Sequence, residues 1–201
     1  MIGEGWGKTD PENAKNYRTR PSILVENEET RILIDTSPDL RTQLLSTQVD
    51  SIDAVLFTHS HADHLNGIDD LRSVNRVIKD WIPAYTNLQT WNDIATRFNY
   101  VLEPLKNDTN FFYKPCLKRN DISTGDRFTI GSLNLSVMDQ DHGFMRTLGY
   151  RINDFAYSTD VVELPEESFE NLEGISTWMV GALWEEPHIT HAHVDKVLNW
   201  A

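Results

Sequence analysis

A histidine-rich stretch at the end of an apolar segment constrains this chain more than any other feature of its sequence. Residues 52–57 read IDAVLF, a composition typical of a strand buried on both faces of a sheet. The next residues, 58–64, read THSHADH and bring three imidazoles and one carboxylate together in one short loop. Imidazoles and carboxylates at this density, directly after a buried strand, predict a metal site.

The spacing within the stretch predicts two neighbouring cation sites. In an extended backbone His59 and His61 project to the same side and can bind one ion. Asp63 and His64, one tight turn later, can face a second ion. A mixed imidazole and carboxylate set suits zinc, manganese or iron, whereas oxygen ligands alone would suggest magnesium or calcium. The alternative is a polar loop or a surface histidine cluster without a metal.

The motif HSHADH at 59–64 resembles the signature of the metallo-β-lactamase superfamily. Its flanks, RTRPS at 18–22, ILIDTSPDLR at 32–41 and HLNGIDDLR at 64–72, resemble the branch that contains the phosphoribosyl cyclic phosphodiesterase of phosphonate breakdown. The resemblance covers nearly the whole chain and is strongest in its first third. It implies an α/β fold of the αββα sandwich type, in which two mixed sheets carry helices on their outer faces.

The resemblance also implies ligands outside the motif. His142 and Asp160 each follow a predicted strand, and by the resemblance they complete the site, with Asp160 bridging two divalent ions, zinc or manganese. Asp35 ends another predicted strand, where it either caps the following turn or, as its family position favours, orients a metal-bound histidine. His191 lies where the resembled phosphodiesterases keep a histidine near the leaving group.

Hydrophobic periodicity predicts the elements between these residues. We expect strands at 21–26, 31–35, 82–86, 128–130, 133–138, 148–152, 155–158 and 177–183, the last of them buried. Helices are expected at 38–47, with Leu45 facing inward, and at 67–78, 88–102, 164–172 and 193–200. Residues 1–20 and 103–124 are expected to be irregular, and the aromatic run 111–113 within them is core, a strand or a patch over the site.

Composition predicts one globular domain and limits its partners. The chain has 201 residues with 39% hydrophobic and 24% charged content, which favours a single metallo-hydrolase domain over 1–201. No apolar run approaches the ~20 residues that span a bilayer, and no signal segment opens the chain, so we expect no membrane association. The single cysteine, Cys116, excludes an internal disulfide and favours the cytoplasm.

A net charge of −13 makes a nucleic-acid partner unlikely, because phosphate backbones select clustered lysines and arginines. A small phosphorylated substrate remains compatible with this charge, since bound dications and a few arginines dominate the field inside a pocket. Arg18, Arg20 or Arg72 could hold a second phosphate, although the sequence favours a surface or structural ion pair for each.

The chain departs from the resembled family at both ends, where the domain is expected to be incomplete. The family normally opens with a further strand and a glycine-rich turn, and its last metal histidine follows another strand and helix. Without that histidine the second ion would keep only Asp63, His64 and Asp160, so the sequence predicts either a fragment or a weakened second site. Bare sheet edges in a fragment would favour self-association, for example as a homodimer.

The leading hypothesis is a metal-dependent phosphodiesterase acting on a small cyclic ribose phosphate. By the resemblance, two ions share a hydroxide that attacks phosphorus in line. Asp63 and His191 are the catalytic candidates, and His191 would protonate the departing oxygen. Two alternatives stay open: an RNA-processing nuclease of the same superfamily, which would need a basic or flexible arm, and a non-catalytic metal-binding or partner-binding domain.

Overall fold

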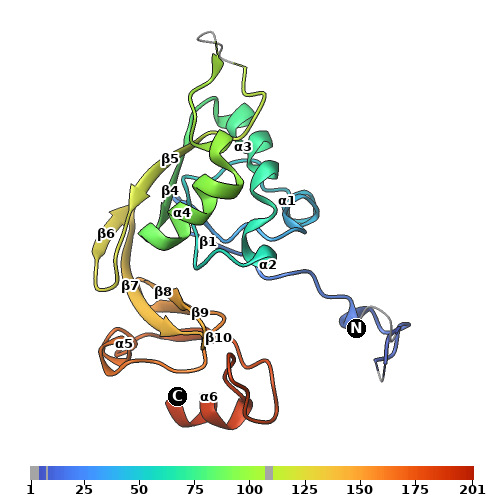
Figure 1. Cartoon of the computed structure of the whole chain (residues 1–201), viewed down its shortest axis with the longest axis vertical. Helices are drawn as coiled ribbons and strands as arrows, with labels where there is room; N and C mark the ends of the chain where they lie inside the picture. The colour runs from blue at the N-terminus through green and yellow to red at the C-terminus, as the bar shows by residue number, and fades with distance from the viewer. Residues whose placement is uncertain (1–4, 8, 107–110) are drawn as a thin grey trace.

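The computed structural model describes residues 5–7, 9–106 and 111–201. In this part of the chain two five-stranded sheets pack against each other and helices lie on their outer faces (Figure 1). The fold is therefore the expected αββα sandwich of the α/β class. Residues 1–4, 8 and 107–110, which belong to the two segments predicted to be irregular, lie outside the described residues.

The first sheet follows the order of the chain. Its strands are β1 (Ile23–Glu26), β2 (Arg31–Ile34), β3 (Ala54–Leu56), β4 (Ile82–Thr86) and β5 (Leu117–Asp121). β1 and β2 form the predicted antiparallel hairpin, and the other neighbours are parallel. The prediction of irregular structure was wrong for β5, because its sequence, LKRND, buries Leu117 alone and shows no apolar alternation.

Helices follow the parallel strands, as crossover connections require. They are α1 (Leu40–Thr47), α2 (Ala62–Leu65), α3 (Leu71–Ile78) and α4 (Leu88–Arg97), with short 3-10 helices η2 (Ile68–Asp70) and η3 (Asn99–Val101). A further 3-10 helix, η1 (Ala14–Asn16), precedes β1. The predicted helices 67–78 and 88–102 are thus each divided into an α and a 3-10 part. The expectation that Leu45 faces inward was wrong: α1 buries Leu40 and packs Leu44 against the core, whereas Leu45, one position after Leu44, is exposed.

The second sheet has the order β10-β9-β8-β7-β6. Its strands are β6 (Arg127–Ile130), β7 (Leu133–Asp141), β8 (Arg146–Ile152), β9 (Phe155–Ser158) and β10 (Thr177–Val180), accompanied by α5 (Glu166–Glu170) and α6 (Val194–Trp200). The strands are antiparallel except for the parallel pair β9 and β10. The prediction of a buried final strand was wrong, because β10 lies at the sheet edge and exposes alternate residues.

The alternation of apolar residues in β2 explains how the layers pack. Ile32 and Ile34 face the second sheet and join Leu135 and Val137 in the core between the sheets. Leu33, between them, points to the other side, where the helices cover the first sheet. A strand with both faces buried must be apolar, and this is the composition that β3 shows throughout and β2 shows from Ile32 to Ile34.

Hydrogen bonds join the two sheets beside the end of β3. The Tyr150 hydroxyl donates to the Phe57 carbonyl at 2.7 Å, and the Leu148 amide donates to the Thr58 carbonyl at 3.0 Å. These contacts fix the start of the histidine-rich loop to the second sheet. No helix among the described residues is long and apolar enough to cross a membrane.

Candidate metal centre

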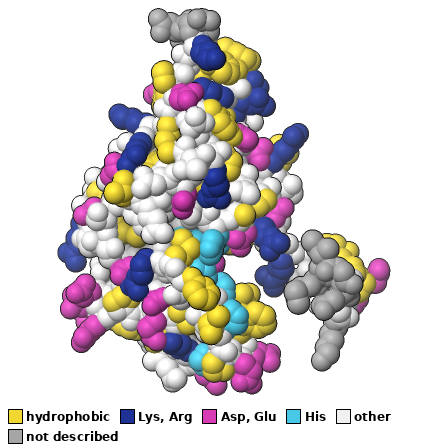
Figure 2. Space-filling model, viewed as in Figure 1, with side chains coloured by type: hydrophobic (Ala, Val, Ile, Leu, Met, Phe, Trp, Pro, Cys, Tyr) yellow, Lys and Arg dark blue, Asp and Glu magenta, His cyan; other side chains and the backbone are white. Residues whose placement is uncertain are grey.

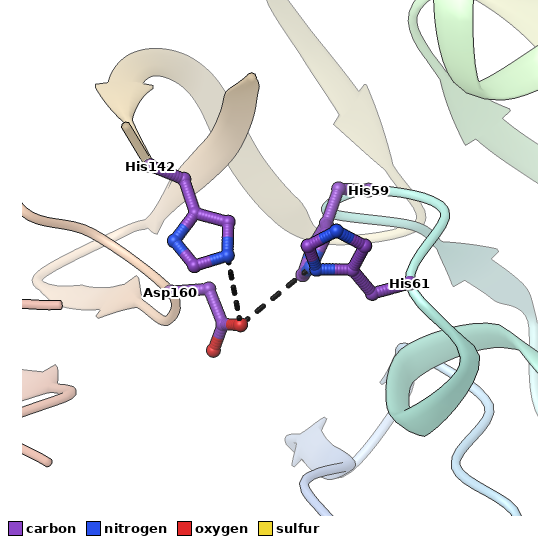
Figure 3. Close-up of side chains that lie close together, drawn as sticks. All are labelled: His59, His61, His142 and Asp160. Atoms are coloured by element: carbon purple, nitrogen blue, oxygen red, sulfur yellow. Dashed lines mark ion pairs between the residues drawn. The ribbon is translucent and has the colours of Figure 1, made fainter. Parts of the chain in front are cut away.

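The candidate ligands come from the ends of three strands that meet at one edge of the sandwich. His59 and His61 follow β3, and His61 is the N-cap of α2, the helix that carries Asp63 and His64. His142 follows β7 and Asp160 follows β9 in the second sheet. The structure therefore brings both halves of the sandwich to this site (Figure 3).

His59, His61, His142 and Asp160 form the first group. Each offers one ligand atom, and these atoms all lie within 4.8 Å of one another. The Oδ2 atom of Asp160 lies 3.7 Å from His59 Nε2 and 3.4 Å from His142 Nε2, and Figure 3 shows the rings turned toward this carboxylate. Three imidazole nitrogens and one carboxylate oxygen are a donor set typical of zinc and other first-row transition metals.

Asp63, His64 and the other oxygen of Asp160 form the second group. His64 Nε2 lies 3.4 Å from Asp160 Oδ1 and 3.7 Å from Asp63 Oδ2. Asp160 thus turns one carboxylate oxygen toward each group, and the bridging role that the resemblance implied for it stays a prediction.

Two buried nitrogen atoms show that these residues fit a divalent cation. His59 Nε2 and His64 Nε2 are inaccessible to solvent and have no hydrogen-bond partner, one in each group. A buried polar atom without a partner costs about 1–3 kcal/mol, and most such atoms in folded proteins are paired. Nitrogen lone pairs directed at a shared carboxylate gain partners when a cation binds between them.

Asp35 orients two of these histidines at once. Its Oδ2 atom accepts hydrogen bonds from His64 Nδ1 at 2.7 Å and from the Thr58 hydroxyl at 2.8 Å, and its Oδ1 atom accepts the Thr58 amide at 2.8 Å. The same hydroxyl oxygen lies 2.9 Å from His59 Nδ1 and accepts its proton. These bonds assign both Nδ1 atoms as protonated, so the Nε2 atoms are the ones that a cation can bind. Of the two interpretations of Asp35 from sequence, the geometry therefore favours the histidine-orienting one.

His142 is oriented from the opposite side. Its Nδ1 donates to the Thr190 carbonyl at 2.7 Å, which leaves Nε2 toward Asp160. His191 follows directly, and its ring lies 4.8 Å from the His142 ring, centroid to centroid. The structure therefore brings His191 to the site, while His193 begins α6 as its N-cap.

Burial and neighbouring charges lower the pKa of His59 and raise the pKa of His64. Burial, followed by the adjacent His64, lowers the pKa of His59 to about 2. Burial also acts to lower the pKa of His64, but the carboxylates of Asp160 and Asp35 outweigh it and raise that pKa to about 10. For Asp160, burial acts to raise the pKa, and His64 with its neighbours lowers it well below the usual range. Without a cation, the site therefore carries its proton on His64.

A pair of residues on α4 braces the loop between His59 and His61. The Ser60 hydroxyl donates to Asp93 at 2.5 Å, and Arg97 Nη2 donates to the Ser60 carbonyl at 2.5 Å. Asp93 and Arg97 are four residues apart and so lie on one face of the helix. Sequence reasoning missed this brace and also Thr58. The place of Thr58 directly before the motif could have indicated its role. Nothing near the motif in the sequence indicates Asp93 and Arg97, which lie more than 30 positions further along the chain.

A cavity of about 660 Å³ opens over the two groups. On the face shown in Figure 2, histidine side chains gather beside a hollow and hydrophobic side chains lie next to them. The cavity is lined by Thr19, Arg20, Pro21, His61, Asp63, His142, Phe144, Met145, Thr159, Asp160, Gly181, Ala182, Leu183, Thr190 and His191.

The three arginines proposed to hold a second phosphate differ in position. Arg20 lines the cavity. The structure does not bring the other two there: Arg18 donates to the Lys15 carbonyl at 3.1 Å, and Arg72 donates to the Tyr113 carbonyl at 3.4 Å on another part of the surface. The aromatic run 111–113 lies with Arg72 and Arg76 and does not line the cavity.

Comparisons with known proteins agree with this geometry. A family model described as a β-lactamase superfamily domain matches residues 30–201. A solved structure, a diphosphatase from the PhnP family, is 30% identical and superposes with a TM-score of 0.80, covering 92% of this chain and 68% of that one.

Two curated relatives match over most of this chain. An octanoyltransferase of Porphyromonas gingivalis is 32% identical over 94% of this chain, and a ribonuclease Z of Methanopyrus kandleri is 24% identical over 67% of it. The chain spans only 37% and 44% of the length of these two proteins. The family match covers more than half of the chain and includes all the candidate ligands. This chain belongs to the metallo-β-lactamase superfamily of hydrolases and, within it, resembles the PhnP family.

Proposed function

We propose that the chain is a metal-dependent phosphodiesterase that binds two divalent cations, zinc or manganese, and acts on a small phosphorylated substrate such as a cyclic ribose phosphate. The similarity to a PhnP-family diphosphatase supports phosphate chemistry. A reducing compartment such as the cytoplasm suits the buried thiol of Cys116, and association into a homodimer stays a prediction.

The proposal rests on the position of the Asp160 carboxylate between the two groups of candidate ligands. One of its oxygens faces His59 and His142, and the other faces His64. A carboxylate with nitrogen donors on both sides suits a pair of cations better than a single one. Such a pair, when bound, supplies Lewis acidity and lowers the pKa of coordinated water toward neutrality.

The remaining residues of the cavity would bind and orient the substrate. Arg20, which lines the cavity, would hold a second anionic group. His191 would donate a proton to the departing oxygen. Burial lowers the pKa of His191, so its donating imidazolium form is a minority at pH 7 and grows as the pH falls. Asp63 would complete the second cation group.

Hydrolysis of bis(p-nitrophenyl) phosphate tests the proposal. Purified protein is freed of metal, reloaded with Mn²⁺ or Zn²⁺ and assayed, and bound metal is counted on the same sample. We expect about two ions per chain and turnover that the Asp160→Asn variant loses by at least a hundredfold. Two bound ions without turnover would contradict the phosphodiesterase activity. One bound ion, together with unchanged turnover in Asp160→Asn, would contradict a carboxylate shared by two cations.

An RNA-processing nuclease is the second candidate, favoured by the match to ribonuclease Z over 67% of the chain. Its weakness is the net charge of −13, which repels a polyanion. Cleavage of a structured RNA at low ionic strength, faster than that of the small diester, would favour the nuclease. Failure on both substrates with one ion or none bound would favour a non-catalytic metal-binding or partner-binding domain.

A further inference from the structure

One aromatic side chain on the cavity wall is exposed to an unusual degree. Phe144 lines the same cavity as His61, Asp63 and Asp160, yet 86% of its surface is accessible to solvent. Exposing a phenyl ring to water is unfavourable, and large apolar residues exposed at a concave site commonly contact a ligand.

The turn that carries Phe144 is held by hydrogen bonds, so the exposure is a property of the fold. The His142 amide donates to the Met145 carbonyl at 2.9 Å, and the Phe144 amide donates to the His142 carbonyl at 3.0 Å. The Gly143 amide donates to Asp141 Oδ1 at 2.6 Å. Tight turns favour glycine, asparagine, aspartate or serine at their tips, so the turn itself does not call for a phenylalanine.

This turn is also pressed against the segment that carries His191. Gly143 has φ +80°, and a Cβ atom at that position would lie 2.6 Å from the Ile189 carbonyl oxygen. The bond from His142 Nδ1 to the Thr190 carbonyl ties the same two segments together. The backbone that carries Phe144 is therefore held at a fixed place relative to the candidate metal ligands.

The cavity has more room than a phosphate group needs, and its walls differ in chemistry. Metal-binding candidates form one side, whereas Phe144, Met145 and Leu183 supply apolar surface. A volume of about 660 Å³ lies in the range of sites that enclose a whole small molecule. A substrate that fills it would place a further group against this apolar surface, next to its phosphate.

We propose that Phe144 is a stacking platform for a nucleobase carried by the substrate, and so a specificity-determining residue. The proposal rests on the phosphodiesterase function above, since the cations would hold the phosphate beside the ring. An aromatic side chain stacks on the face of any base, so the platform selects for the presence of a base and not for its identity.

Equilibrium binding of two phosphate monoesters tests the platform without catalysis. Thymidine 5′-monophosphate carries a base and methyl phosphate does not, and both present the same phosphate group. Titration calorimetry compares them on the Mn²⁺-loaded wild type, on Phe144→Ala and on Phe144→Trp. Leu45→Ala is the matched control, since Leu45 is a 69% exposed residue on α1 outside the cavity.

We expect the wild type and the Leu45 variant to bind the thymidine ester about 5- to 150-fold more tightly than methyl phosphate. Phe144→Ala should lose that preference while keeping its affinity for methyl phosphate, and Phe144→Trp should restore it. An unchanged preference in Phe144→Ala, or equal weakening of both ligands, would overturn the proposal. The result is independent of turnover: a Phe144-dependent preference without hydrolysis of any diester would reject the phosphodiesterase and keep the platform.

Discussion

Replacing Asp35 by asparagine should weaken cation binding while leaving the fold in place. The substitution keeps the size of a side chain that is completely buried. It changes which hydrogen bonds the group can accept: Asp35 receives three, from the Thr58 amide, the Thr58 hydroxyl and His64 Nδ1. Asparagine offers one carbonyl oxygen and one amide nitrogen.

The asparagine amide group can take two orientations, and the backbone amide of Thr58 disfavours one of them. If its nitrogen faces the Thr58 amide, two donors oppose each other in the interior, at a cost of about 1–3 kcal/mol. If its nitrogen faces His64 instead, the hydroxyl of Thr58 can rotate to accept, and His64 Nδ1 must also become an acceptor. The single proton of a neutral His64 then moves to Nε2, the atom that should face the cation.

We therefore expect Asp35→Asn to bind Mn²⁺ or Zn²⁺ about 10- to 100-fold more weakly, the usual effect of losing a partner that orients a ligand histidine. Competition with a chelating dye measures the affinity, and thermal unfolding of the metal-free protein reports the fold. Asp139→Asn is the control, because Asp139 pairs with Arg146 outside the cavity. If Asp35→Asn binds the cation with unchanged affinity, then Asp35 does not fix the tautomer of a cation-binding His64, and the reasoning is refuted.

Three further predictions follow from the same geometry. Because the pKa of His64 is raised to about 10 in the metal-free protein, cation binding at pH 8 should release about one proton, and the apparent affinity should rise with pH until about 10. Calorimetry in buffers of different ionisation enthalpy measures the release, and no release would contradict ligation by His64. Arg97→Met removes the hydrogen bond to the Ser60 carbonyl and should weaken cation binding roughly threefold to tenfold, whereas Arg119→Met, on the exposed strand β5, should not; equal effects would reject the brace. Since both sheets supply ligands, the unfolded chain should bind the cation poorly, and a cation at a hundred times its Kd should stabilise the fold by about 2.7 kcal/mol, or roughly 5–10 °C in Tm. An unchanged Tm would mean that the unfolded chain binds the cation equally well, which contradicts a site assembled from both sheets.

The sequence predicted the strands around the site because their composition follows their burial. β2, β3 and β4 are nearly continuous apolar runs, and the polar residues that end them mark where the chain leaves the core. The same rule fails at sheet edges. β5 exposes its lysine and arginine to solvent, and β10 buries no residue completely, so neither strand carries the pattern that its place in the sheet would suggest.

The candidate ligands could be predicted from motif and resemblance, but the residues that hold them could not. His59 and His61 are two positions apart, and their common side follows from an extended backbone. Arg97 reaches Ser60 across 37 positions, and Thr190 reaches His142 across 48. Such partners are decided by how β-strands and loops pack in three dimensions, and neither residue differs from an ordinary surface residue in the sequence.

The backbone of Asp35 and Asp160 shows why the site depends on the closed sandwich. Asp35 follows β2 with φ 62°, and Asp160 follows β9 with φ 47°, so both adopt a left-handed conformation that costs an L-residue about 1–2 kcal/mol. Each is held there by its neighbours: the Asp35 amide donates to the Leu56 carbonyl at 2.8 Å, and the Thr147 hydroxyl donates to the Asp160 carbonyl at 3.1 Å. One of these carboxylates belongs to each sheet, and they meet through His64, which lies between them. The strain can persist only while the strands on both sides are paired, and therefore the cation site forms only after the two sheets have packed together.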